Sequence, residues 1–294
     1  MYRNSVGSSL VSPESKCQNC HMWHAAPTEG PDCADERRVT QAGYQILLVG
    51  GIFMRPSDRS LRCRLGACCG KCFDGTMHRD TVDLGNDVFM MDTRMGGYED
   101  ITSSYLIRSS KPCLVETGSA RSAPVVVEQL AQLGIGPADL ATIVVTHIHL
   151  DHAGGVGDLA ETFPNADVVV QERGARHLAD PSRLVASAHR VFGEAMDRLF
   201  GDLQPTPATR IVSIAERGEV DLGDGRHLAA FHNPGHASHH IGLVDSATGD
   251  LYTGDAAGVY VPETADVRPA TPPPDFDLDL TLSSLAAMRE VGPT

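Results

Sequence analysis

The chain has 294 residues, of which 41% are hydrophobic and 21% are charged, values that are ordinary for a globular protein with a substantial core. Its longest apolar run, residues 44–54, is shorter than the roughly 20 residues that cross a bilayer, and its first residues lack the pattern of a secretory signal, so we predict a cytoplasmic protein without a membrane partner. Residues 1–80 hold ten basic and eight acidic side chains, whereas residues 81–294 hold 14 basic and 30 acidic ones. This excess of 16 negative charges repels a phosphate backbone, so we expect no nucleic-acid partner.

Residues 1–76 form a cysteine-rich segment with little sustained periodicity and one candidate strand within residues 45–54. Seven of the eight cysteines lie here, at positions 17, 20, 33, 63, 68, 69 and 72. The Cys17-x-x-Cys20-His21 motif has the form of a c-type haem attachment site, but the missing export signal argues against that function. The C-x-x-C pairs at 17/20 and 69/72 offer a structural zinc site, although their spacing is wider than in zinc ribbons. We favour a third interpretation, a poorly ordered extension.

From residue 81 onward the pattern becomes regular. Short apolar and β-branched runs predict strands over residues 88–91, 104–107, 113–115, 141–145 and 168–170. Helical spacing of apolar residues predicts helices at residues 123–133, 174–178, 189–200 and 280–291. Two hairpins are expected, one turning at Asp224-Gly225 and one joining residues 241–244 to 251–253, and the Pro-rich residues 261–277 should form an ordered loop or lid. Strands that alternate with helices indicate a layered α/β domain.

A dense cluster of metal-ligand side chains follows the strand predicted over residues 141–145, where His147, His149, Asp151 and His152 fall within six positions. In an extended segment, side chains two positions apart point to the same side, so His147, His149 and Asp151 are expected to converge. Neutral imidazoles and a carboxylate suit zinc, iron or manganese. A surface turn that happens to be rich in histidine is the alternative, and its place directly after a buried strand argues against it.

Two later segments each carry one more ligand-type residue. Asn233-Pro-Gly-His236 places a histidine after a tight turn, and Tyr252-Thr-Gly-Asp255 places a carboxylate after a hairpin strand. The order H-x-H-x-D-H, then a distant His, then Asp, resembles the metallo-β-lactamase superfamily, and within it the glyoxalase II-like hydrolases. The resemblance covers residues 81–294. It implies the four-layer αβ/βα sandwich of that superfamily for a domain over residues 77–294.

The resemblance also implies ligands for two divalent metal ions, with zinc as the first choice and iron or manganese as alternatives. His147, His149 and His236 would hold the first ion, Asp151 and His152 the second, and Asp255 would bridge the two. The family's remaining ligand is a histidine on a strand that follows a helix like residues 280–291, and no histidine follows His240 here. We therefore expect a domain truncated at its C-terminus, without its last strand, and a weaker second metal site.

The chemistry implied by such a site is hydrolysis. Two cations share a water molecule and bring its pKa towards neutrality, so that a metal-bound hydroxide attacks a carbonyl. Asp151 would act in catalysis by orienting that nucleophile. The implied function is a metal-dependent hydrolase of an ester, thioester or lactone, with a small-molecule acyl substrate. The sequence leaves open the identity of that substrate and the oligomeric state.

Two positions partly separate the other branches of the superfamily. Flavodiiron oxidoreductases usually carry Glu where this chain has His149, and many zinc β-lactamases carry Cys where it has Asp255, so electron transfer and antibiotic hydrolysis are disfavoured. A persulfide dioxygenase-like oxidoreductase, with one iron on His147, His236 and Asp255, stays open. So does a truncated metal-binding protein without turnover.

The remaining histidines of the regular region are expected to have other roles. Three of them flank His236, and the resemblance favours His236 itself as the ligand; the three are His232, His239 and His240. We expect His239 and His240 to support the ligands or line a pocket. Three more fall in helical or turn contexts and are expected to be solvated, namely His177, His189 and His227.

Overall fold

The computed structural model describes residues 46–47, 81–261 and 266–293. All of these residues belong to one compact unit, residues 43–294. The cysteine motifs predicted to lie in a poorly ordered extension fall outside the described residues, so the haem, zinc and extension interpretations stay predictions. Within the candidate strand at 45–54, the structure describes a two-residue strand, β1 (Ile46–Leu47).

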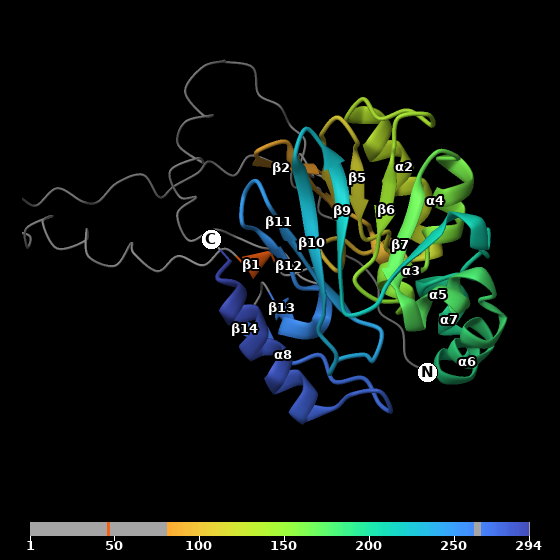
Figure 1. The fold of residues 1–294 in the computed structure, drawn as a ribbon. Coiled ribbons are helices and arrows are strands. Elements are labelled where there is room, and N and C mark those ends of the chain that lie inside the picture. Colours follow the sequence, from red (N-terminus) through yellow and green to blue (C-terminus); the bar gives the residue numbers. More distant parts are fainter. Residues whose placement is uncertain (1–45, 48–80, 262–265, 294) are drawn as a thin grey trace, which may run out of the picture. The chain divides into compact units, whose positions relative to one another are not determined.

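The larger sheet has seven strands in the order β2-β3-β4-β5-β6-β7-β8 (Figure 1). They are β2 (Thr81–Gly85), β3 (Val88–Asp92), β4 (Ser103–Ile107), β5 (Cys113–Val115), β6 (Thr142–Val144), β7 (Asp167–Gln171) and β8 (Ile211–Ile214). From β2 to β5 neighbouring strands are antiparallel, and from β5 to β8 they are parallel. Because parallel neighbours need a crossover connection, the helices are concentrated in the second half of this sheet. The five strands predicted from apolar runs are confirmed as β3 to β7.

The smaller sheet has five strands in the order β1-β12-β11-β10-β9. Its long members are β9 (Arg217–Gly223), β10 (Arg226–His232) and β11 (Ile241–Asp245), and β12 (Leu251–Tyr252) pairs with β1 in parallel. Both predicted hairpins are confirmed. Asp224 and Gly225 turn the first of them with φ angles of 51° and 81°, the left-handed values that a two-residue type I′ turn requires.

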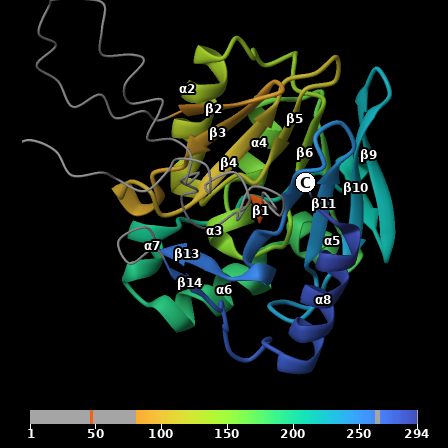
Figure 2. The same cartoon turned by 90° about the vertical axis from the view of Figure 1, so that its left-hand side faces the viewer.

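The two sheets pack face to face and are covered by helices on their outer sides, which makes four layers (Figures 1 and 2). Helices α2 (Ala123–Gln132) and α4 (Val156–Thr162) bury their apolar sides against the larger sheet. Tyr105 and Tyr252 meet edge to face between the sheets, with ring centroids 5.4 Å apart. Helix α8 (Leu278–Val291) covers the smaller sheet through Met288. The αβ/βα sandwich predicted from the sequence is therefore confirmed.

The helix predicted over residues 189–200 is wrong as a single element. The structure has α5 (Glu172–Ala179), α6 (Ser182–Phe192) and α7 (Ala195–Leu199), and the break between the last two falls at Gly193. Gly193 has a φ of 53°, which ends α6 because a left-handed residue cannot continue a right-handed helix. As a result Val191 is 74% exposed although Met196, on the next helix, is fully buried.

The Pro-rich segment is also more structured than a loop. It contains β14 (Asp266–Arg268), which pairs antiparallel with β13 (Val259–Val261). It then leads into α8, whose first turn is capped by Asp277, because a carboxylate oxygen of this residue accepts the N–H of Leu280 at 3.0 Å. Among the residues described, no helix combines the length and apolarity needed to cross a membrane.

Candidate metal centre

The predicted ligands come from three segments that end at the same edge of the fold. His147 and His149 follow β6, His236 follows β10, and Asp255 follows β12 in a 3-10 turn (Gly254–Ala257). Because β10 and β12 are each antiparallel to β11, they run in the same direction, and the loops after both lie at one edge. The backbone of Ile241, at the start of β11, donates to the carbonyl of Thr146 at 2.8 Å and joins the histidine loop to that edge.

The three imidazoles that the resemblance assigns to the first ion lie close together. Nε2 of His147 lies 3.0 Å from Nδ1 of His149, and Nε2 of His236 lies 2.9 Å from the same Nδ1 and 3.2 Å from Nε2 of His147. The Nδ1–H of His236 donates to the carbonyl of Ala270 at 3.0 Å, so its Nε2 presents a lone pair to the group. Nitrogen donors around a tetrahedral zinc, with Zn–N distances of about 2.0–2.1 Å, would lie about 3.3 Å apart. The three histidines therefore fit a metal ion.

A second set of donors adjoins the first. Nε2 of His152 lies 3.3 Å from Oδ1 of Asp255 and 3.6 Å from Oδ2 of Asp151, and Oδ2 of Asp255 lies 3.7 Å from Nε2 of His236. Nε2 of His152 and Oδ1 of Asp255 are buried without a hydrogen-bond partner among the residues described. A buried polar atom without a partner is costly, and a cation between these two atoms would satisfy both. Asp255, which faces both sets, is placed to bridge them.

The extended backbone expected at Asp151 is wrong, although its side chain does lie beside His152. Strand alternation holds for His147 and His149 only. His149 is the last extended residue, with φ −64° and ψ 150°, and helix α3 (Leu150–Ala153) starts directly after it. Asp151 therefore reaches the site from the first turn of a helix, and its side chain is 32% exposed.

Burial and charge set the protonation of the cluster. Burial, reinforced by the neighbouring histidines, lowers the pKa of His149 to about 3 and holds that of His147 well below its usual range. Both rings are therefore neutral at pH 7, which is the form that ligates metals. Burial opposes the charged form of His152 as well, but the carboxylates of Asp255 and Asp151 outweigh it and raise the pKa of His152. The second set of donors thus attracts positive charge, which a metal ion would supply.

Glu116 belongs to the site and was missed in the sequence. It directly follows β5; one carboxylate oxygen lies 3.1 Å from Nδ1 of His152, and the other accepts the N–H of Thr146 at 2.7 Å. A carboxylate behind a metal-ligating histidine fixes the ring and its tautomer. An acidic residue directly after a buried strand was the available signal. Only the sheet order, which places β5 next to β6, brings it to the cluster.

The histidines that are not proposed ligands lie in different surroundings. His240 is fully buried; its Nδ1 lies 2.7 Å from Oδ1 of Asn233, and its ring stacks on His147 with centroids 4.8 Å apart. Nδ1 of His239 accepts the N–H of Ile148 at 3.4 Å, and this ring borders a cavity. Three others lie outside the cluster: His232 contacts the carbonyl of Ser238, His189 pairs with Asp202, and His227 is on β10. His177, expected to be solvated, is half-buried and lines the same cavity as His239.

A family model described as the metallo-β-lactamase superfamily matches residues 97–294. The chain belongs to this superfamily. A metallo-β-lactamase fold-containing protein of Sulfurisphaera tokodaii is 33% identical over 156 residues, 51% of this chain and 56% of that protein. A hydroxyacylglutathione hydrolase of Synechococcus sp. is 29% identical over 153 residues, 51% of this chain and 47% of that enzyme. The chain thus spans about half the length of these two relatives.

The solved structures agree with the metallo-β-lactamase assignment. The structure of an archaeal superfamily protein from Sulfolobus tokodaii superposes with a TM-score of 0.54 at 26% identity, covering 65% of this chain and 70% of that chain. The four-layer arrangement is therefore the fold of a superfamily member. Relatives named as hydrolases are among the proteins that this chain resembles.

Proposed function

We propose that this chain is a metal-dependent hydrolase that cleaves an ester, thioester or lactone of a small-molecule acyl substrate at a dinuclear site, in the manner of the glyoxalase II-like branch. The observation that carries the proposal is the pair of unpartnered buried atoms, Nε2 of His152 and Oδ1 of Asp255, beside three converging imidazoles. His147, His149 and His236 would hold the first ion. Asp151 and His152 would hold the second, and Asp255 would lie between them.

Divalent ions bound at these ligands, zinc first among the candidates, would supply a water of near-neutral pKa and positive charge for a developing oxyanion. The chain's own residues hold the geometry. Glu116 fixes the ring of His152, and the carbonyl of Ala270 fixes the ring of His236. Asp151, which is partly exposed beside His152, can accept a proton from an attacking water at its carboxylate and keep that water oriented.

One alternative uses fewer of these residues. A single iron on His147, His236 and Asp255 would suit a persulfide dioxygenase, and the separations of 3.2 Å and 3.7 Å from Nε2 of His236 are compatible with it. That arrangement leaves the ring nitrogens of His149 and His152 facing the same space without a function. A dinuclear site uses both, and we favour it for this reason.

Metal analysis combined with a substrate panel tests the proposal. The purified full chain is reconstituted with zinc, iron or manganese, and its metal content is measured with the hydrolysis of aryl esters, acyl thioesters and lactones. We expect two equivalents of zinc, the second bound more weakly, and hydrolysis that a chelator abolishes and zinc restores. One equivalent of iron with oxygen consumption on a persulfide would support the oxygenase instead. Bound metal without turnover on any of these substrates would indicate a metal-binding protein.

A further inference from the structure

A cavity of about 620 Å³ opens beside the candidate metal centre. Its wall includes Ile148, which lies between two of the proposed ligands, and His239, whose ring centroid is 5.6 Å from that of His149. Ligand-type atoms of His149, His239 and Asp275 all lie within 4.8 Å of one another. This volume is in the range of small-molecule sites. A group bound here would adjoin the proposed reaction centre.

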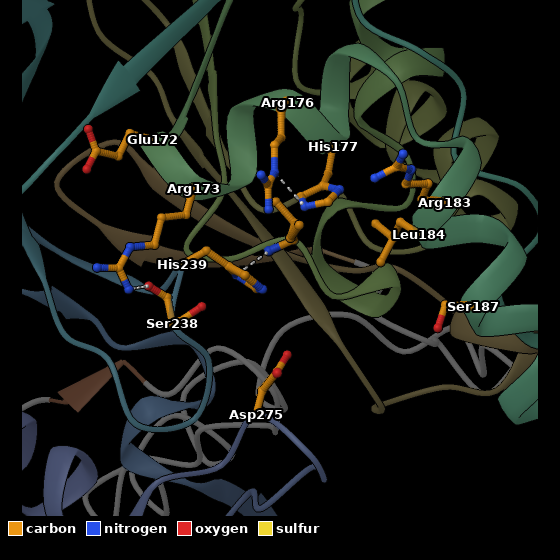
Figure 3. Close-up of a pocket in the computed structure, with 11 residues that line it drawn as sticks. Glu172, Arg173, Arg176, His177, Arg183, Leu184, Ser187, Ser238, His239 and Asp275 are labelled. Carbon is orange, nitrogen blue, oxygen red and sulfur yellow. Dashed lines mark hydrogen bonds between the residues drawn. The ribbon is translucent and has the colours of Figure 1, made fainter.

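The lining of this cavity is basic although the chain as a whole carries a net charge of −14. Arg173 and Arg176 come from α5, and Arg183 comes from the start of α6 (Figure 3). Two acidic residues also line it, and in Figure 3 the carboxylate of Glu172 points away from the other side chains, which leaves Asp275 at the opposite side. The guanidinium groups of Arg176 and Arg183 lie near His177, whereas that of Arg173 lies beside Ser238, on the same side of the view as Glu172.

Most N–H donors of the three cavity arginines make no hydrogen bond to the described residues. No carboxylate of the described residues lies within 4.0 Å of Arg173, Arg176 or Arg183 as an ion pair. One N–H of Arg173 donates to the carbonyl of Ser238 at 3.4 Å, and one of Arg176 donates to Nε2 of His177 at 3.1 Å. Each guanidinium carries five N–H donors, so most remain available to a ligand. Burial, with Arg176 and Arg183 nearby, lowers the pKa of His177, and the neutral ring accepts the N–H of Arg176.

We propose that this cavity binds a carboxylate of the acyl substrate, so that α5 and α6 select anionic substrates for the adjacent site. The inference rests on the proposed hydrolase function for its catalytic meaning. Guanidinium forks match the two oxygens of a carboxylate, so a cavity lined by arginines that have no acidic partner among the described residues favours such a group. A long uncharged acyl chain fits poorly, because only Ile148 and Leu184 offer aliphatic side chains among the lining residues.

Matched substrate pairs test the inference in the zinc-reconstituted full chain. The first pair is p-nitrophenyl adipate monoester and its terminal amide, which places the charge on the acyl side. The second pair is the acetyl thioester of 3-mercaptopropionate and that of 3-mercaptopropionamide, which places it on the leaving side. We expect kcat/KM to be at least about tenfold higher for the carboxylate member of one pair, the size of a charge-assisted hydrogen bond. Equal rates within both pairs would overturn the inference and leave the hydrolase function standing.

Arginine variants test whether the preference for the carboxylate substrate arises at this cavity. Arg176→Gln and Arg183→Gln should remove most of it by raising KM for the carboxylate substrate more than KM for the neutral amide, and a circular dichroism spectrum like that of the unchanged chain shows that the fold is intact. Arg190→Gln is the matched control, since Arg190 is exposed on the same helix, α6, and does not line the cavity. A preference that survives both cavity variants would contradict the assignment.

If no substrate is turned over, the proposed hydrolase function is refuted. Direct binding of a carboxylate then tests the anion site by itself. Calorimetric titration of the full chain with adipate should then show binding that the Arg176→Gln/Arg183→Gln double variant loses. Absence of adipate binding would refute the anion site. Binding of inorganic phosphate in place of adipate would show that the site selects phosphate and would overturn the carboxylate assignment.

Discussion

Glu116 and His152 form a buried pair in which Oε2 of the carboxylate lies 3.1 Å from Nδ1 of the ring, with side-chain exposures of 1% and 2%. The other oxygen of Glu116 accepts the N–H of Thr146, the residue that precedes the first histidine of the cluster. One carboxylate therefore fixes both a proposed ligand ring and the loop that carries the others. Because the Nδ1–H is held by Glu116, Nε2 of His152 is the nitrogen that presents a lone pair to a metal.

Replacing Glu116 with Gln should weaken the second metal equivalent. The amide N–H₂ would face the Nδ1–H of His152, and relieving that donor–donor contact would move the ring proton to Nε2, the ligating atom. We expect a loss in affinity of about 10- to 100-fold, measured by competition with a chromophoric chelator. Glu161→Gln, at an exposed position on α4, is the control. Unchanged affinity in Glu116→Gln would show that this carboxylate does not support the metal.

Alanine substitutions of two ligands should differ in their consequences. His147 belongs to both candidate clusters, one with His149 and His236 and one with His152 and Asp255, so His147→Ala should weaken binding of both equivalents. His236→Ala removes a donor from one cluster only and should lose one. Elemental analysis after dialysis measures both, with His227→Ala on β10 as the control. Full metal retention by either ligand variant would refute the ligand assignment.

Gly254→Ala should disturb the metal centre, because the added methyl group would overlap neighbouring side chains. Gly254 has a φ of 47°, and a Cβ there would overlap the hydroxyl of Thr146 and Nε2 of His240. Gly134→Ala is a matched control, since Gly134 also has a positive φ, 84°, but open space around its missing side chain. We expect the control to lower the free energy of unfolding by about 1–2 kcal/mol, and Gly254→Ala to lower it by a further ~1–3 kcal/mol from overpacking.

Urea unfolding of the metal-free proteins measures this difference between the two glycine variants. Metal content should also fall in Gly254→Ala alone, because the overlap displaces the turn that carries Asp255. Equal stability losses in the two variants would mean that the close approach around Gly254 relaxes without cost.

Deletion of residues 1–76 should leave the fold and metal content of the remainder intact. The described contact of that segment with the domain is the pairing of β1 with β12, which involves two residues on each strand. A circular dichroism spectrum and metal analysis of residues 77–294 test this. Unfolding would show that β1 is part of the core and that the predicted boundary at residue 77 is wrong. Zinc retained by the isolated segment would support the C-x-x-C interpretation.

Local patterns in the sequence were enough for much of the fold and for part of the site. The strands β3 to β7 were predicted because each is a short apolar run, and the Asp224-Gly225 turn because its backbone angles favour those residues. The convergence of His147 and His149 followed from the two-residue period of an extended chain. Each of these properties depends on residues that are neighbours in the chain.

Other features depend on which distant segments become neighbours, and only the tertiary structure decides them. Glu116 supports His152 because β5 lies next to β6, and the cavity arginines reach the site because α5 and α6 pack beside the histidine loop. The helix break at Gly193 was not visible in the apolar spacing, since a glycine fits either a helix or a break. The sequence by itself determined the donor atoms and the strands that carry them. Long-range packing determined which residues contact those donor atoms. A hydrogen bond or an ion pair forms between groups that are close in space, and such groups can be far apart in the sequence.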